Sequence, residues 1–272
     1  IAIERGIPTI LDYFTRDVAR KIKKEYGTAK IITATNAFAH IDDVHDAVDS
    51  ILEVLKDDGL FITESHYLLQ LIRMNQFDSV YHEHLRHYSL HSLKYLLEMH
   101  GLEIIHAKQI PTHAGSIRVY AARKGKYDVQ ETVAPLLEEE RRTILSKEAL
   151  NNFRKKTIQA KLDFVALLRD IKKRGERVYG IGAPFRGTTL IKYVGIDEGI
   201  VDCVLEVKSS PKIDKYIPGT IIPILEESKI FKNEEILLPE YLPEILPHRE
   251  DKIKRLADNI LPASKGRKPQ NH

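Results

Sequence analysis

The sequence is poor in groups that hold a fold together covalently. It contains a single cysteine, Cys203, among 272 residues. One cysteine excludes a disulfide framework and any zinc site made of several cysteines within these residues. A chain with so little cysteine is typical of a reducing compartment, and we therefore expect a cytoplasmic protein.

Long apolar runs and an excess of charge are also absent. No apolar stretch approaches the roughly 20 residues that span a bilayer, and residues 1–6 lack the charged-then-apolar layout of a signal peptide. Charged residues make up 30% of the chain, yet the net charge is only +3. This balance favours neither nucleic acid nor a membrane as a partner.

What the sequence does contain is a pattern of α/β domains. Hydrophobic residues make up 43% of the chain, enough at this length for two modest cores. Periodicity predicts strands at 30–35 and 60–63, separated by a helix over 44–55 with Gly59 just past its end. Further elements are predicted at 90–97 (helix) and at 103–107 and 117–121 (strands). Strand, helix and strand in this order imply a parallel pair, and we expect helices on both faces of the sheet.

The amino-acid composition changes in the second half of the chain. Residues 131–174 are charged and helix-forming, with an apolar stripe that includes Leu150, Leu162 and Leu168, which predicts long helices between two domains. A second α/β unit is predicted from strands at 177–181, 202–205 and 235–238 and a helix at 188–194. The expected divisions are 1–127 (first domain), 128–175 (bridging helices), 176–262 (second domain) and 263–272 (a disordered tail).

Histidines are concentrated in the first domain. Ten of the twelve lie between His40 and His113, so groups that titrate near neutral pH gather there. The densest stretch is the tetrad Tyr81-His82-Glu83-His84, which follows the predicted strand at 60–63. Because ligands of open α/β sheets bind beyond the carboxyl ends of the strands, we predict that at least one tetrad residue is catalytic. His40 closes the other strand of the pair and is predicted to face the same pocket.

Other interpretations of these histidines stay open. His82 and His84 are structural in one of them, one buried and hydrogen-bonded and the other solvated. In another, His82, His84 and His87 hold zinc together with Glu83, although ligands so close in sequence rarely converge on one ion. His40 is almost as easily explained by a structural hydrogen bond near the start of a helix.

A glycine-rich turn, residues 180–187, lies between a predicted strand and helix of the second domain. Its glycines let the backbone approach a phosphate, and Arg186 supplies a positive fork. A plain tight turn is the alternative. The turn departs from a dinucleotide fingerprint because Pro184 interrupts it and no third glycine stands at the expected offset. Glu206 is the one acidic residue near the end of the next strand. These departures argue against a dehydrogenase.

Taken together, five motifs resemble the successive signatures of the sugar-nucleotide C-methyltransferases. They are residues 36–41 (NAFAHI), 77–84 (FDSVYHEH), 112–119 (THAGSIRV), 180–187 (GIGAPFRG) and 216–220 (YIPGT). Their order and spacing agree over nearly the whole chain. Two positions depart from the pattern, since Ala114 and Asp214 stand where glycine is usual.

The resemblance implies a fold, a cofactor and a substrate. Members of this family methylate thymidine-diphosphate-linked 4-ketosugars and have an N-terminal zinc domain, a methyltransferase domain and a C-terminal Rossmann-like domain. This chain is expected to begin after the zinc domain and the first cofactor loop. The fold expected is therefore a partial class I methyltransferase (Rossmann-like) domain, a helical linker and a second Rossmann-like α/β domain. The implied cofactor is S-adenosylmethionine, and the implied partners are a nucleotide-diphosphate sugar and a separately supplied N-terminal portion.

The resemblance also implies roles for the tetrad. A proton beside the 4-keto group must be removed before the enolate attacks the sulfonium methyl. By resemblance His84 is the general base, and Glu83 holds its imidazole in one tautomer or contacts the sugar. Tyr81 and His40 donate to the enolate oxygen, and His82 is structural.

Binding residues follow in the same way. The implied contacts are Asn36 and Ala37 for the cofactor, His113 for the substrate, and Gly182, Ala183, Arg186, Lys212 and Lys215 for its diphosphate. No metal ligand is assigned. The rival function is a non-catalytic nucleotide-sugar-binding module that has lost its cofactor site.

Overall fold

The computed structural model describes residues 2–230. The chain divides into two compact units, residues 1–158 and 159–272. The division falls inside helix α6 (Lys147–Lys173), within the segment predicted as bridging helices. The predicted strand at 235–238 and the tail at 263–272 lie outside the described residues.

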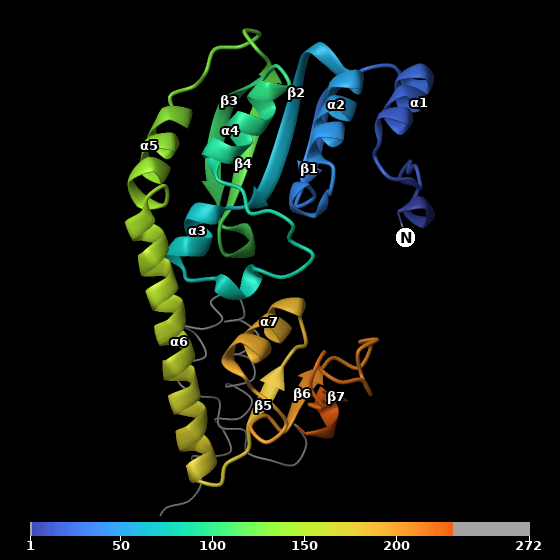
Figure 1. Ribbon diagram of the computed structural model, residues 1–272. Helices are drawn as coiled ribbons and strands as arrows, with labels where there is room; N and C mark the ends of the chain where they lie inside the picture. Colours follow the sequence, from blue (N-terminus) through green and yellow to red (C-terminus); the bar gives the residue numbers. More distant parts are fainter. Residues whose placement is uncertain (1, 231–272) are drawn as a thin grey trace, which may run out of the picture. The chain divides into compact units, whose positions relative to one another are not determined.

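The first unit is built on a four-stranded mixed sheet with the order β1-β2-β4-β3 (Figure 1). Its elements are α1 (Arg16–Tyr26), β1 (Ala29–Thr35), α2 (Val44–Val54), β2 (Leu55–His66), α3 (Leu68–Arg73), α4 (Leu90–Met99), β3 (Leu102–Ile110), β4 (Ser116–Arg123) and α5 (Val133–Thr143), with 3-10 turns at Ile3–Arg5, Phe38–His40, Phe77–Ser79 and Thr112–Ala114. Strands β1 and β2 are parallel, which confirms the predicted crossover. Strand β4 pairs antiparallel with both β2 and β3, because the short loop between β3 and β4 permits only a hairpin.

Helix α2 begins and ends for local reasons. The Asp43 side chain accepts a hydrogen bond from the Asp46 N–H at 2.9 Å and caps the first turn. The helix ends at Val54, and Gly59, predicted to follow the helix, lies inside β2 instead. A Cβ at Gly59 would lie 2.7 Å from the Leu55 side chain and 3.1 Å from the Ala29 carbonyl oxygen. Glycine is therefore required by close approach rather than by a helix end.

The core lies on one face of this sheet. Helices α2 and α4 both lie in front of the strands in Figure 1, and their side chains pack with Phe61 of β2 and Val119 of β4 in one buried cluster. On the opposite face Ile31, Thr33 and Thr35 of β1 are exposed. The expectation of a sheet covered on both faces is therefore wrong for the described residues, since β1 leaves that face open.

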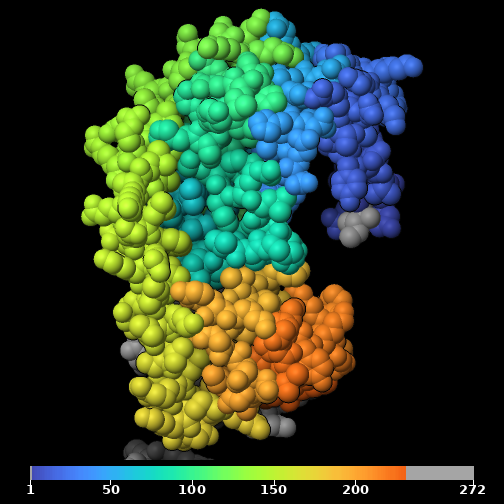
Figure 2. Space-filling model, in the orientation of Figure 1, coloured from blue at the N-terminus to red at the C-terminus, as the bar shows by residue number. Residues whose placement is uncertain are grey.

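Helix α1 is attached to α2 by ion pairs and by buried apolar side chains. The Arg16 guanidinium lies 3.3 Å from the Asp46 carboxylate and also pairs with Asp49, and Lys23 pairs with Glu53 at 2.9 Å. The two helices form a continuous surface in the space-filling view (Figure 2). Exposed pairs of this kind contribute about 0–1 kcal/mol each, so apolar contacts of Val18 and Ala19, both buried, are needed as well.

The second unit has a smaller sheet, parallel throughout, with the order β5-β6-β7. Its elements after α6 are β5 (Tyr179–Ile181), α7 (Phe185–Val194), β6 (Cys203–Glu206), β7 (Ile224–Glu226) and a 3-10 turn at Glu227–Lys229. Leu168 of α6 packs with Val204 and Ile224 in its core. Leu150 and Leu162 of the predicted apolar stripe are exposed.

Among the described residues, the one α-helix that follows α6 begins earlier than predicted. Helix α7 starts at Phe185 rather than near residue 188, directly after Pro184. Proline lacks a backbone N–H, which the first turn of a helix does not need for its internal hydrogen bonds. No helix among the described residues is long and apolar enough to cross a membrane.

Candidate active site

The loops that carry the candidate residues meet at one edge of the first sheet. Because β1 and β2 are parallel, their carboxyl ends lie side by side, and the Asn36 N–H donates to the Glu64 carbonyl at 2.8 Å. Asn36 itself adopts a left-handed φ of 52° and turns the chain toward Ala37 and His40. The two proposed cofactor contacts, Asn36 and Ala37, are thus half-buried residues at the strand end.

Backbone hydrogen bonds attach the tetrad segment to the loop after β1. The Leu85 N–H donates to the Ala39 carbonyl at 2.9 Å, and the Arg86 guanidinium donates to the Ile41 and Asp42 carbonyls, the latter at 2.7 Å. These contacts join residues more than 40 positions apart. The structure therefore brings His40 and the tetrad together, as the sequence predicts.

His84 is held in one tautomer by the main chain. Its Nδ1 lies 3.0 Å from the Ser79 carbonyl oxygen, which can only accept, so Nδ1 carries the hydrogen in the neutral ring. Nε2 then has a lone pair and lies 3.2 Å from the Tyr81 hydroxyl. This is the arrangement of an imidazole that can accept a proton at Nε2. The prediction that the Glu83 side chain holds this tautomer is wrong, because the Ser79 carbonyl does so.

His40 is oriented in a similar way. Its Nδ1 donates to the Glu83 carbonyl oxygen at 2.8 Å, and its ring centre lies 5.0 Å from that of His84. Glu83 thus contributes its main chain to the site. With Nδ1–H already used, the exposed His40 ring donates a second hydrogen bond only as an imidazolium. His82 is exposed, and its ring lies edge-on to Tyr81.

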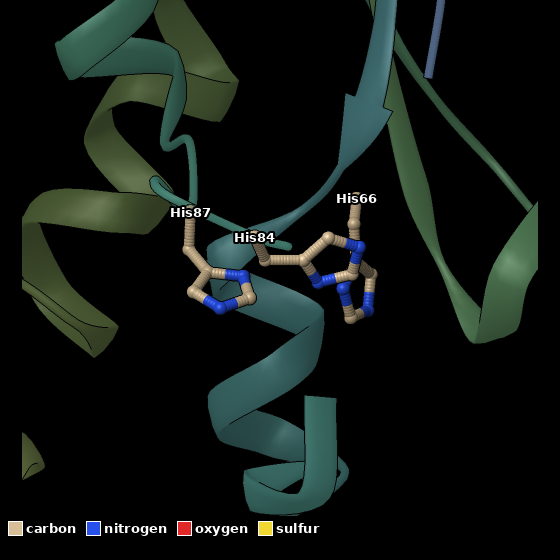
Figure 3. A group of neighbouring side chains, drawn as sticks. All are labelled: His66, His84 and His87. Atoms are coloured by element: carbon tan, nitrogen blue, oxygen red, sulfur yellow. The ribbon is translucent and has the colours of Figure 1, made fainter. Parts of the chain in front are cut away.

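His66, which the sequence analysis did not name, and His87, which it considered only as a zinc ligand, complete the cluster. The rings of His66, the last residue of β2, and His87 lie 6.0 Å apart, and His84 lies 5.5 Å from His87 (Figure 3). Nε2 of His87 is buried without a hydrogen-bond partner. Burial, together with the nearby His66 and His84, lowers the pKa of His87 to about 4. A strand end was the available signal for His66, but the predicted strand stopped at residue 63.

The loop that carries His113 is anchored by a buried carboxylate. Glu64 accepts two hydrogen bonds from the Arg118 guanidinium, at 2.8 and 3.1 Å, and one from the Thr112 hydroxyl at 3.1 Å. His113 and Ala114 both have left-handed φ values, 52° and 61°. The His113 side chain is exposed, and hydrogen bonding fixes its loop rather than its ring.

In the second unit the glycine turn is closed by charged side chains. Glu206 accepts a hydrogen bond from the Ala183 N–H at 2.6 Å, while the Lys212 ammonium donates to the Ala183 carbonyl at 2.6 Å. Gly182 has a left-handed φ of 78°. Arg186 lies in the first turn of α7. Gly182, Ala183 and Lys212 are therefore brought together, with Arg186 next to them in the chain and an acidic group among them.

Lys215 is placed differently from Lys212. Its side chain is exposed, and its backbone N–H donates to the Lys212 carbonyl at 3.2 Å. It belongs to the same loop as Lys212. Among the described residues, it makes no hydrogen bond to the glycine turn.

Comparison with known proteins gives two partial likenesses. A stretch of 51 residues is 53% identical to part of ORC1-type DNA replication protein 1 from Sulfurisphaera tokodaii. The stretch covers 19% of this chain and 13% of that protein. A solved S-adenosylmethionine-dependent methyltransferase from Anabaena variabilis is similar over 43% of this chain and 58% of that chain, with 14% identity and a TM-score of 0.34. Neither likeness is extensive enough to assign a family.

One further relative and two family models together cover most of the chain. This chain is 31% identical to the C-methyltransferase NovU of Streptomyces niveus over 268 residues. The match covers 96% of this chain and 64% of that relative. The chain thus spans a little under two-thirds of the relative's length. Residues 6–107 match a methyltransferase domain, and residues 111–258, more than half of the chain, match the C-methyltransferase C-terminal domain. The chain therefore belongs to the C-methyltransferase family.

Proposed function

We propose that this chain catalyses S-adenosylmethionine-dependent C-methylation of a nucleotide-linked 4-ketosugar, with thymidine diphosphate as the nucleotide, in the cytoplasm. The observation that carries the proposal is the environment of His84. Its Nδ1–H is held by the Ser79 carbonyl, and Nε2 lies 3.2 Å from the Tyr81 hydroxyl. A relative that is itself a C-methyltransferase supports it.

The proposed reaction begins with a proton transfer. His84 accepts the proton from the carbon beside the keto group at Nε2, and the Ser79 carbonyl stabilises the imidazolium that results. The enolate oxygen accepts hydrogen bonds from the Tyr81 hydroxyl and from a protonated His40. Glu83, which lies between Tyr81 and His84 in the chain, is proposed to contact the sugar.

When bound, S-adenosylmethionine would supply an electrophilic methyl group to the enolate carbon and leave as S-adenosylhomocysteine. Asn36 and Ala37 fit contacts to its methionine portion, because they are half-buried at the end of β1. They supply only part of what such a ligand needs, since β1 is the edge strand of the described sheet.

The second unit is proposed to bind the diphosphate. Arg186, Lys212 and Lys215 provide positive charge, and Gly182 and Ala183 provide a backbone turn before a helix N-terminus. The Ala183 N–H is already bound to Glu206, so it becomes available to a phosphate only if that carboxylate turns away. His113, on an anchored loop of the first unit, is proposed to contact the sugar.

Exchange of the substrate's acidic hydrogen tests the base directly. In D₂O the wild-type chain is expected to exchange the hydrogen beside the keto group of a thymidine-diphosphate ketosugar, as followed by NMR, without any methyl donor. His84→Gln should lose exchange but keep its affinity for thymidine diphosphate. His82→Gln, an exposed neighbour in the tetrad, is the matched control. Exchange that persists in His84→Gln would overturn the assignment of the base.

A non-catalytic nucleotide-sugar-binding module is the second candidate. It is favoured by the position of β1 at the edge of the described sheet, which leaves Asn36 and Ala37 as the proposed cofactor contacts. Calorimetric titration separates the two functions. Binding of thymidine diphosphate without S-adenosylhomocysteine, and without exchange, would identify the module.

A further inference from the structure

We propose that His66, His84 and His87 form a binding site for a divalent transition-metal ion of the zinc type. One ring nitrogen from each residue lies within 4.8 Å of those of the other two. The three rings gather at the end of β2 (Figure 3), one from the strand and two from the segment that follows α3. The proposal goes beyond the proposed function, which needs no metal at this place.

The distances are close to those of a coordinated ion. Zinc binds imidazole nitrogen at about 2.0–2.1 Å in a tetrahedral arrangement, which separates two ligand nitrogens by about 3.4 Å. The ring nitrogens of the three histidines lie at most 4.8 Å apart, which exceeds that separation by no more than about 1.4 Å. Small rotations of the side chains close such a gap without moving the backbone.

Hydrogen bonds leave the rings in tautomers suited to metal. His84 donates from Nδ1 to the Ser79 carbonyl, so its lone pair is on Nε2, where an ion would take the place of the Tyr81 hydroxyl at 3.2 Å. The Gln76 amide donates to the Ala114 carbonyl at 3.0 Å, so its oxygen faces His66 Nε2 at 2.8 Å and leaves the Nδ1 lone pair of His66. Metal-bound histidines characteristically donate their second N–H to such oxygens.

His87 adds an independent reason to expect a ligand. Its Nε2 is buried and has no hydrogen-bond partner, and a buried polar atom of this kind costs about 1–3 kcal/mol unless something satisfies it. A cation held by the other two rings would be available to one of its nitrogens.

The ligand set selects the kind of ion. Three imidazoles without a carboxylate favour zinc, copper, nickel or cobalt over magnesium and calcium, which prefer oxygen. Three protein ligands with an open fourth position are typical of zinc sites that bind water or substrate. The set differs from the one considered from sequence, because His66 replaces the exposed His82.

Occupancy of this site has a consequence for the proposed base. The Nε2 lone pair of His84 binds either a metal ion or a proton, so metal binding and proton abstraction exclude each other. Zinc is therefore expected to inhibit deuterium exchange by the chain, and a chelator is expected to restore it.

The test measures metal binding without substrate or cofactor. The full chain, stripped with a chelator, is titrated with Zn²⁺ by calorimetry, and X-ray absorption of the zinc-loaded wild type reports its ligands. We expect one tight ion with three imidazole nitrogens and no sulfur, so that Cys203 takes no part. Zinc bound by sulfur or by oxygen alone would overturn the proposal. Because this measurement uses the wild-type chain, its result holds even where a variant fails to fold.

Variants then identify the ligands. His66→Gln and His87→Gln are expected to weaken Zn²⁺ binding by about tenfold or more, since even outer partners of a ligand cost 10–100-fold. His82→Gln and His45→Gln are matched controls. His45 is not part of this cluster, and its ring nitrogen lies 2.8 Å from that of His100. Equal affinity in His66→Gln and wild type, or equal loss in the controls, would refute the site. Because no ketosugar is used, failure here is distinguishable from failure of the proposed methyl transfer.

Discussion

The two units orient their candidate groups in opposite ways. In the first, main-chain carbonyls hold side chains, as Ser79 holds His84 and Glu83 holds His40. In the second, side chains hold the main chain, as Glu206 and Lys212 bind the N–H and carbonyl of Ala183. The first unit therefore presents side-chain nitrogen atoms, whereas the second presents charges around a backbone turn.

This difference suits two kinds of chemistry. An imidazole whose tautomer is fixed by a carbonyl is prepared to take a proton. A turn surrounded by arginine and lysine is prepared to bind an anion, but gains nothing from proton transfer. The comparison favours a division of labour in which the first unit performs the chemical step and the second binds the nucleotide.

The largest expected effect comes from removing each of the two roles by a separate mutation. His84→Gln should lower the rate of deuterium exchange by about 10²–10⁴-fold, the usual contribution of a general base, with unchanged affinity for thymidine diphosphate. Arg186→Gln should weaken that affinity by about tenfold, as expected for loss of a charge-assisted contact of about 1.5 kcal/mol. Its exchange rate at saturating substrate should stay close to that of the wild type. If either variant changed both quantities to the same degree, the division of labour would be refuted.

Much of this arrangement could be predicted from the sequence, for a physical reason. The periodicity of the residues between β1 and β2 predicts a helical crossover, and a crossover makes the two strands parallel. Parallel strands place their carboxyl ends at one edge, which is why His40 and the tetrad were expected to meet. Their meeting through the Ala39 and Ile41 carbonyls confirms that expectation.

What could not be predicted depends on contacts without a sequence signature. Every residue has a carbonyl, so nothing marks Ser79 as the partner of His84. The charged residues Lys56, Asp57 and Asp58 hide the start of β2, and its end at His66 was missed as well. Strand β7 has three residues, too few for an alternating pattern to be recognised.

Acid sensitivity should differ between the units by a moderate amount. The pKa of His87 is lowered to about 4, whereas an unfolded histidine titrates near 6.5. Between these values the unfolded chain binds more protons, so stability falls as pH drops from about 6.5 to 4 and is unaffected above that window. Because the ring is partly exposed and screened, we expect a loss of at most about 2 kcal/mol.

Hydrogen exchange followed by mass spectrometry, with a chelator present, can assign this loss to one unit. Protection of the first unit should decrease between pH 6.5 and 4 after correction for intrinsic exchange, while that of residues 159–230, which contain no histidine, should not show this component. His87→Gln should flatten the dependence in the first unit. An unchanged slope in that variant would show that other groups cause the acid sensitivity.

A smaller effect is expected from the carboxylate in the glycine turn. Glu206→Gln keeps an oxygen that can accept from the Ala183 N–H but removes a negative charge near the proposed diphosphate. Unit charges about 4 Å apart in a watery site interact by about 1 kcal/mol, so affinity for thymidine diphosphate should rise about fivefold. His84→Gln serves as a control that leaves this affinity unchanged. Weaker binding in Glu206→Gln would mean that the carboxylate contacts the nucleoside instead.

The smallest expected effects compare one strained residue in each unit. Ala114 and Asp214 both have a left-handed φ of 61°, a backbone conformation that favours glycine. The strain costs alanine roughly 1–2 kcal/mol, while glycine's extra freedom in the unfolded chain costs about 0.5–1 kcal/mol. Ala114→Gly should therefore stabilise the first unit by about 0.5–1 kcal/mol.

Asp214→Gly should change the second unit little, because aspartate tolerates this conformation through local hydrogen bonds. Local hydrogen-exchange protection of each unit measures both changes. Gly101→Ala offers a reciprocal control, since this glycine has a φ of 75° and open space around its Cβ position, so it should lose about what Ala114→Gly gains. A larger gain in Asp214→Gly than in Ala114→Gly would show that the second unit, although smaller, is the more strained of the two.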